Sequence, residues 1–130
     1  MPSALLNERT RTRLALDVQL ACTRASRRRG LLGHDTLPPM TGLMLSPCFA
    51  IHTAFMRFPI DVVFIDGDGR AVRIIRNLRP WRIAVSSIAR AVIELPEGAL
   101  SNVDLRIGDR LHLVSEASPL RVAPEGRQAC

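Results

Sequence analysis

The segment from Cys48 to Asp66 reads CFAIHTAFMRFPIDVVFID and sets His52, Arg57 and Asp61 into an otherwise almost wholly apolar run. Buried polar groups are paired in native proteins, because an unpaired one costs free energy. Arg57 and Asp61 therefore either satisfy each other, hold irregular backbone in place, or face a pocket in which a ligand supplies the missing partner. In the structural interpretation, Asp61 accepts backbone N–H bonds or pairs with Arg57, and it stabilises the bend that leads into the next strand.

The functional interpretation is a pocket for an anion or another small ligand. Arg57 would be a fork-shaped hydrogen-bond donor to that ligand, and His52 would be a second polar contact. On one extended strand, His52 and Met56 share a face and Arg57 and Asp61 share the opposite face, unless the chain bends at the proline before Asp61. The candidate ligand-binding residues are His52, Met56, Arg57, Asp61 and Trp81.

Metal binding and nucleophilic catalysis are weaker interpretations of the same segment. Cys48 and His52 are four residues apart, a spacing that suits two metal ligands on a helix, whereas on strands they would need further ligands from elsewhere. Cys48 as a nucleophile beside His52 has no evident orienting group. The sequence also contains no GxGxxG, P-loop, HExxH or GxSxG motif. We therefore assign no catalytic residue, metal site or cofactor, and an enzyme that uses His52, Arg57 and Asp61 is the alternative.

The composition is that of a globular protein. With 130 residues, of which 47% are hydrophobic, the chain is long enough for one packed domain. No apolar run approaches the roughly 20 residues of a membrane-spanning helix, so we expect no membrane span. The charged N-terminus does not resemble an export signal, and the three cysteines show no CxxC spacing, so we expect free thiols and a cytoplasmic location.

The basic residues raise the question of a polyanionic partner. All 18 of them are arginines, and the net charge is +6. Three consecutive arginines occur at 27–29, and we interpret them as part of a solvated helix face. Only four Phe and one Trp accompany the arginines, too few for a convincing base-stacking platform. Nucleic-acid binding through an arginine-rich surface is therefore a further alternative rather than the main expectation.

The elements around the candidate residues are mostly short strands. Alternating apolar residues predict a strand over 14–20, and residues 22–32 predict one or two helical turns. Asp66–Gly69 and Gly108-Asp109 predict tight turns, because Asp and Gly tolerate positive φ. Residues 77–87 are expected to be a long connection around Trp81, and 99–104 one helical turn. The further expected strands are 41–45, 49–53, 60–65, 70–76, 89–95 and 110–114.

This pattern predicts a mainly β fold, a compact antiparallel β sandwich or pseudo-barrel with one short N-terminal helix. We expect a flexible N-terminus over 1–12, a single β-rich domain over 13–115 and a loose tail over 116–130. Glu94 is expected either to face solvent or to pair with an arginine. Asp109 is expected to make a structural bond within its turn, and Trp81 to cover the core or to border a ligand cleft.

Six blocks of the sequence form a recognisable pattern: 29–33, 42–45, 51–66, 80–82, 91–98 and 108–111. In order and spacing, these blocks resemble the small prokaryotic family known as domain of unknown function 192. The resemblance covers about residues 13–114 and implies a compact β-rich pseudo-barrel, with no established reaction, substrate or cofactor. Two positions depart from the family pattern: Leu32 stands where Met is common, and Ala54 stands where Gly is frequent.

Together these observations predict a non-catalytic protein that binds a small ligand, such as an anion, or a protein partner.

Overall fold

The computed structural model describes residues 3–21, 37–54 and 56–115. Within these ranges the chain forms ten strands and no helix, which confirms the mainly β class. Accordingly, none of the described residues belongs to a helix that could cross a membrane. The helical turns expected at 22–32 and the tail expected at 116–130 lie outside the described residues. The strands are β1 Ser3–Asn7, β2 Thr12–Ala15, β3 Asp17–Ala21, β4 Thr41–Leu45, β5 Ala50–His52, β6 Ile60–Ile65, β7 Ala71–Leu78, β8 Ile83–Val85, β9 Ala91–Pro96 and β10 Leu111–Ser115.

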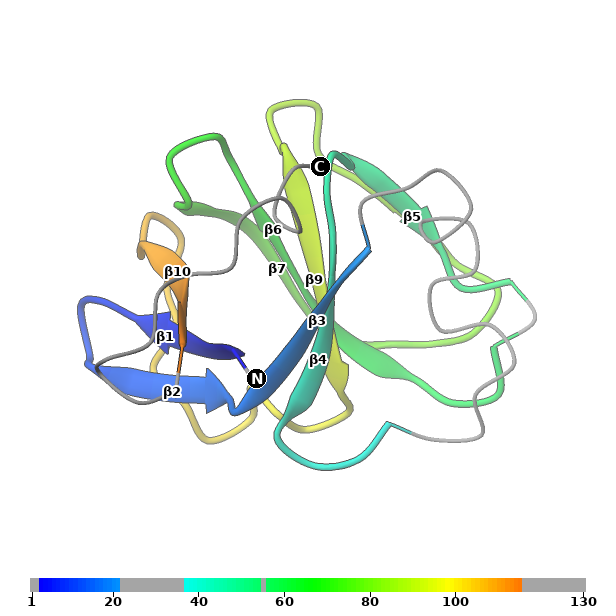
Figure 1. Cartoon of the computed structure of the whole chain (residues 1–130). Helices are drawn as coiled ribbons and strands as arrows, with labels where there is room; N and C mark the ends of the chain where they lie inside the picture. The colour runs from blue at the N-terminus through cyan, green and yellow to red at the C-terminus, as the bar shows by residue number, and fades with distance from the viewer. Residues whose placement is uncertain (1–2, 22–36, 55, 116–130) are drawn as a thin grey trace.

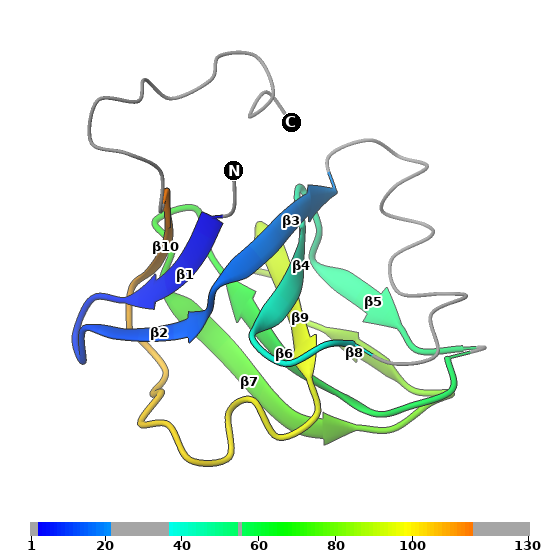
Figure 2. The ribbon, with the colours of Figure 1, turned by 60° about the horizontal axis from the view of Figure 1, so that its bottom comes forward.

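A five-stranded sheet, sheet B, forms the middle layer in the strand order β3-β4-β9-β6-β7. β3 and β4 run parallel, and the other neighbours are antiparallel. The interior strand β6 is buried at every position, as its continuous apolar sequence predicts for a strand that is covered on both faces. The two covering layers are smaller sheets, which lie on either side of sheet B (Figures 1 and 2).

Sheet A, with the order β10-β1-β2, covers one face of sheet B. Leu5, Leu14 and Leu111 of sheet A form one core cluster with Val63 and Ile93 of sheet B. Burial of such side chains contributes roughly 1.5–3 kcal/mol each to the free energy of unfolding.

Sheet C is a two-stranded antiparallel ribbon of β5 and β8, and it covers the opposite face of sheet B. Ile51 of β5 and Ala84 of β8 point inward and form a second core cluster with Val62, Phe64 and Val92. The ribbon and sheet A are therefore separated by the full thickness of sheet B, and Figure 1 shows β5 at the far end of the molecule from β1, β2 and β10.

The structure corrects several local expectations. The strand expected at 14–20 is split at Leu16 into β2 and β3, which belong to different sheets. The first described strand is β1, within the segment for which we had expected no strand, and Ala4 and Leu5 are completely buried there. β8 lies within the long connection expected at 77–87, and residues 99–104 form turns rather than a helical turn.

The predicted hairpin between β6 and β7 is confirmed. Asp66 Oδ1 accepts hydrogen bonds from the backbone N–H groups of Asp68 and Arg70, at 2.9 and 3.0 Å, and these bonds lower the pKa of Asp66. Gly69 has a φ of 82°, and a Cβ atom at this position would lie 2.8 Å from the carbonyl oxygen of Leu111. Gly69 therefore satisfies both the backbone conformation and the close approach of β10.

Candidate functional site

Asp61 lies in the interior of sheet B with both carboxylate oxygens occupied. Its side chain is buried, Oδ1 accepts the N–H of Asn77 at 2.9 Å, and Oδ2 accepts the N–H of Leu100 at 2.9 Å. The register of β6 and β7 shifts beside Asp61, and Asn77 has a φ of 60°, a conformation that Asn tolerates better than most residues. Asp61 therefore holds a bulge in β7 and the turn that follows β9, as the structural interpretation proposed.

Thr53 ties the Trp81 turn to the end of β5. Its hydroxyl donates to the carbonyl oxygen of Arg79 at 2.6 Å and accepts the N–H of Arg82 at 2.8 Å, while its carbonyl oxygen accepts the N–H of Trp81 at 3.0 Å. Trp81 itself has a φ of 64°, a region that bulky residues rarely occupy and that costs about 1–3 kcal/mol. The bonds from the completely buried Thr53 hold this turn.

The other candidate residues do not share one environment. Met56 is buried in the second core cluster, whereas His52 and Arg57 are exposed, and His52 Nδ1 accepts the N–H of Ala54 at 3.3 Å. The Trp81 side chain is 61% exposed, so the expectation that it covers the core is wrong. The candidates thus divide into an interior pair, Met56 and Asp61, and three residues that face solvent.

The ribbon carries an unusual outward-facing surface. The register pairs His52 with Ile83 and Ala50 with Val85, and these residues point away from the core because Ile51 and Ala84 between them point into it. Large exposed apolar side chains also lie within three residues of the two strands. We call the following set the ribbon surface: Phe49 (57% exposed), Trp81 (61%), Ile83 (77%), Val85 (44%) and Ile88 (64%).

Glu94 lies in sheet B on the face that the ribbon covers. It stands between Leu43 of β4 and Val62 of β6 in the sheet register, and it is two residues from the inward-pointing Val92. Its side chain is buried, and among the described residues Oε1 has no hydrogen-bond partner. This burial raises the pKa of Glu94 to about 7. The expectation of an exposed or arginine-paired Glu94 is therefore wrong, because sheet C covers a face that we had expected to be wet.

The opposite end of the molecule contains a network of charged groups around Asp109. The buried carboxylate of Asp109 accepts bonds from Arg9 Nε at 2.6 Å, from Asn7 Nδ2 at 3.0 Å and from the backbone N–H of Arg106 at 2.9 Å. These bonds hold the pKa of Asp109 well below its usual range and raise the pKa of Arg9. The structural role expected for Asp109 is confirmed, and its turn bond goes to Arg106.

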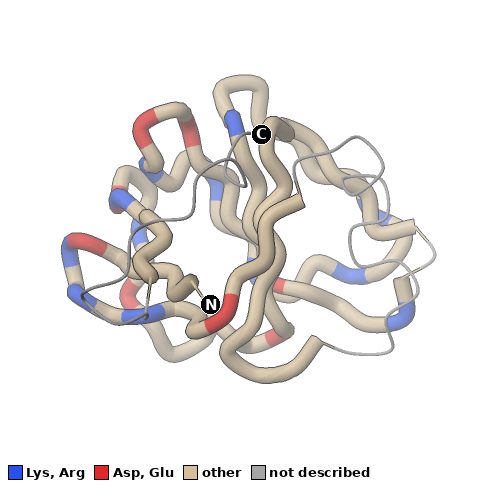
Figure 3. Tube along the Cα trace, viewed as in Figure 1, with Lys and Arg blue, Asp and Glu red and all other residues tan. Residues whose placement is uncertain are grey.

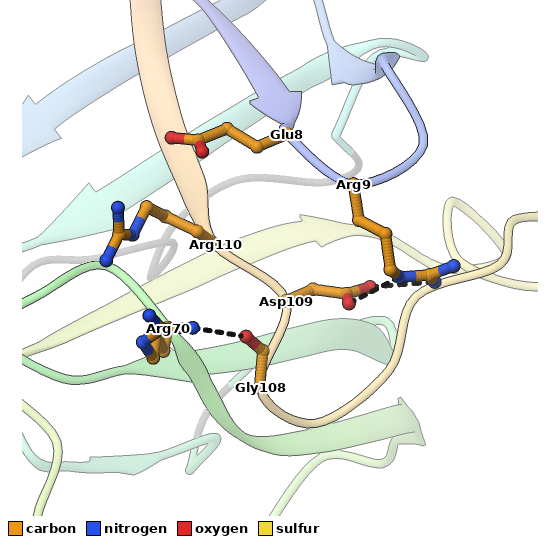
Figure 4. A pocket seen from close by; sticks show the side chains of 6 residues that line it. All are labelled: Glu8, Arg9, Arg70, Gly108, Asp109 and Arg110. Carbon is orange, nitrogen blue, oxygen red and sulfur yellow. Dashed lines mark hydrogen bonds and ion pairs between the residues drawn. The ribbon is translucent and has the colours of Figure 1, made fainter.

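A shallow pocket of about 350 Å³ lies beside this network (Figure 4). Arg9 extends onto Asp109, whereas Arg70 and Arg110 lie on the other side of it. Arg70 and Arg110 face each other across an isolated antiparallel bridge, and Arg70 Nη1 donates to the carbonyl oxygen of Gly108 at 3.3 Å. Like charges directly opposite each other on neighbouring strands repel. This pair is not recognisable in the sequence, because the two positions are 40 residues apart in the chain.

These features define a class of protein: an open, three-layered β protein with an ion-paired end and an apolar ribbon end. Among the described residues, no group of three or more His, Cys, Asp or Glu side chains is placed to hold a metal ion. The model of the family DUF192, described as Uncharacterized ACR, matches residues 5–113. The chain belongs to this family, as the resemblance predicted.

Curated proteins are similar to this chain in sequence, and solved structures are similar to it in fold. A UPF0127 protein of Pyrococcus horikoshii is 38% identical over 48% of this chain and 54% of its own length. A UPF0127 protein of Pyrococcus abyssi is 38% identical over 50% of this chain and 56% of its own length. The chain thus spans about half the length of the curated relatives it matches. A Sinorhizobium meliloti protein described as a candidate transcription regulator has a similar fold, with a TM-score of 0.74, 24% identity and coverage of 85% of this chain and 91% of its own. A Novosphingobium aromaticivorans protein of unknown function also has a similar fold, with a TM-score of 0.73 and 22% identity. The similarity covers 86% of this chain and 84% of that protein.

Proposed function

We propose that this protein is a non-catalytic binding protein that contacts its partner through the ribbon surface. The observation that carries the proposal is the exposure of five large apolar side chains on and beside one short ribbon. Contiguous exposed apolar patches on proteins commonly mark interaction sites. A cytoplasmic setting is part of the proposal.

The chemistry of the former candidate residues supports binding rather than catalysis. Asp61 is buried, and both of its carboxylate oxygens accept backbone N–H groups, so its side chain holds the fold and is not presented to a substrate. His52 stands on the outer face of the ribbon, opposite Ile83, and thus contributes to the proposed contact surface. Trp81 contributes to the same surface from its restrained turn.

The test is site-specific photo-crosslinking in cells. Ile83 is replaced by p-benzoylphenylalanine in one strain and Ile107 in another, since both are exposed isoleucines, at 77% and 61%, and Ile107 lies near the ion-paired end. We expect a discrete adduct from position 83 and none of the same size from position 107. Identical adduct patterns from both positions, or no adduct with either a protein or a lipid from position 83, would overturn the proposal.

A second candidate function is the binding of a small anion between Arg70 and Arg110. The specific observation in its favour is the pair of like charges placed opposite each other at the edge of a pocket. A bound anion would relieve the repulsion between them. We expect inorganic phosphate to raise the Tm of the wild type and not that of Arg110→Gln. An equal rise in the control Arg13→Gln and in Arg110→Gln would show a general salt effect and would reject this site.

A further inference from the structure

The ribbon surface combines exposed apolar side chains with neighbouring charges that are positive. The two stretches of sequence that contain the ribbon strands, 36–60 and 69–93, include no Asp or Glu. Of their seven arginines, Arg70 lies at the pocket beside Asp109 and Arg76 donates to the carbonyl oxygen of Leu100. The other five are Arg57, Arg73, Arg79, Arg82 and Arg90. Figure 3 shows acidic and basic segments together on the side of sheet A, whereas the coloured segments on the side of β5 are basic.

Some of these arginines border the apolar side chains directly. Arg73 Nη1 donates to the carbonyl oxygen of Val85 at 2.6 Å, which places the guanidinium against β8. Arg82 Nη1 donates to the carbonyl oxygens of Pro80 and Trp81, both at 3.3 Å, so its charge lies beside the turn that presents the indole ring. The ribbon surface is thus an apolar centre with a cationic rim.

We propose that the partner of the ribbon surface is an anionic lipid bilayer, to which the protein docks peripherally; this inference rests on the proposed function. Exposed aromatic and aliphatic side chains enter the boundary between headgroups and acyl chains, where Trp is favoured because its ring is amphipathic. Arginine pairs with lipid phosphate through its fork of N–H donors. Each basic residue near an anionic membrane surface contributes enough attraction for about a fivefold change in affinity.

The backbone of the ribbon is compatible with this environment. β5 and β8 pair with each other along all three of their residues, and the outer edges of the ribbon would lie at the depth of the polar headgroups, where they can be hydrogen-bonded. The most exposed side chain, Ile83, stands in the middle of the surface with Trp81 two residues before it and Val85 two residues after it. Protruding side chains of this kind fit a deformable lipid surface better than a rigid partner, which would need matching cavities.

The experiment uses the full chain with two kinds of vesicle, phosphatidylcholine alone and phosphatidylcholine mixed with phosphatidylglycerol. Trp81 is the one tryptophan of the sequence and there is no tyrosine, so its fluorescence emission reports directly on the ribbon surface. We expect a blue shift of this emission and co-sedimentation with the anionic vesicles only. Added salt should weaken the binding, since exposed charges are screened.

Matched variants separate the contributions of the apolar centre and the rim. We expect Ile83→Ser with Ile88→Ser to weaken vesicle binding by about tenfold or more, and Arg79→Gln with Arg82→Gln to weaken it by more than about tenfold. Ile107→Ser, at another exposed isoleucine near the opposite end, should bind like the wild type.

Two outcomes would overturn the lipid proposal. The first is an unchanged Trp81 emission with anionic vesicles at low salt. The second is equal binding by the wild type and by Ile83→Ser with Ile88→Ser. If the vesicles fail while the cross-linker at position 83 captures a specific protein, the ribbon surface remains a binding surface and its partner is that protein; if both experiments fail, the proposed function falls as well.

Discussion

The two ends of this molecule use arginine in opposite ways. At the end formed by sheet A and the turn before β10, Arg9 and Arg106 are bound to the carboxylates of Asp104 and Asp109. At the ribbon end, the sequence supplies arginines without acids and exposes apolar side chains between them. The net charge of +6, from 18 arginines and 12 acidic residues, is therefore unevenly distributed over the molecule. The first arrangement stabilises the fold, and the second is available for a partner.

The largest predicted effect concerns the ion-paired end. Asp109→Ala removes a buried carboxylate and leaves the buried Asn7 amide and Arg9 without their acceptor, so we expect a loss of about 3–5 kcal/mol in the free energy of unfolding, measured with denaturant. The control is Asp104→Ala, which removes another partner of Arg9 whose side chain is 54% exposed, and it should destabilise the protein far less because solvent screens this pair. Equal losses in the two variants would contradict the special role of the buried carboxylate.

Acid titration sharpens the same contrast. The pKa of Asp109 is lowered in the folded protein, so its contribution is complete above the unfolded pKa and is lost as the pH falls below about 4. Asp109→Ala should therefore lose less stability on acidification than the wild type. A parallel decline of both proteins between about pH 5 and pH 3 would refute this assignment.

The next effect lies beneath the ribbon. Burial raises the pKa of Glu94 from an unfolded value of 4.5 to about 7, so the folded state binds more protons and stability falls as the pH rises through this interval. Glu94→Gln removes the titration. We expect it to resemble the wild type near about pH 5 and to be more stable by about 3 kcal/mol at about pH 8, measured by chemical denaturation. A constant difference between the two proteins at both pH values would show that Glu94 does not titrate in this range.

A smaller loss is expected at the bulge held by Asp61. Asp61→Asn places an amide N–H₂ against one of two backbone donors, so one charge-assisted bond is lost and we expect about 2 kcal/mol of destabilisation, measured as a lower Tm. The matched change Asp68→Asn, at an exposed position of the β6–β7 turn, should shift stability by less than about 0.5 kcal/mol. An unchanged Tm in Asp61→Asn would contradict the structural role of Asp61.

The smallest effect is expected on the ribbon surface itself. Ile83→Ser alters a side chain that is 77% exposed, so the free energy of unfolding should change by no more than about 0.5 kcal/mol. The neighbouring change Ala84→Asp, which buries a charge in the second core cluster, should be far more damaging. If Ile83→Ser were strongly destabilising, the residue would serve the fold, and its exposure would not indicate a binding surface.

The part of the fold that the sequence predicts best is the part whose pattern is local. β6 is a continuous apolar run closed by Asp66–Gly69, and both its burial and its hairpin follow from neighbouring residues. Asp61 was also predictable, since a carboxylate within such a run needs donors, and backbone N–H groups were one of the expected solutions.

The elements that escaped prediction depend on distant partners or on an inverted pattern. β1 is held by β10, more than 100 residues away, as the Ser3–Ser115 pairing shows. β8 buries its small residue, Ala84, and exposes the larger Ile83 and Val85, the reverse of the alternation that identifies a half-buried strand. Its outward surface, the proposed binding site, could not be recognised before the layer it belongs to was known.

Thr53 gives the ribbon surface one further property. Because its hydroxyl and its backbone groups bond to Arg79, Trp81 and Arg82, the turn that carries the indole is preorganised before any partner arrives. A partner therefore meets a ring whose backbone conformational entropy was already lost when the protein folded, and little of the contact energy is consumed in ordering it. Thr53→Val should loosen the turn while keeping the shape of the side chain, and so convert a rigid contact surface into an adaptable one.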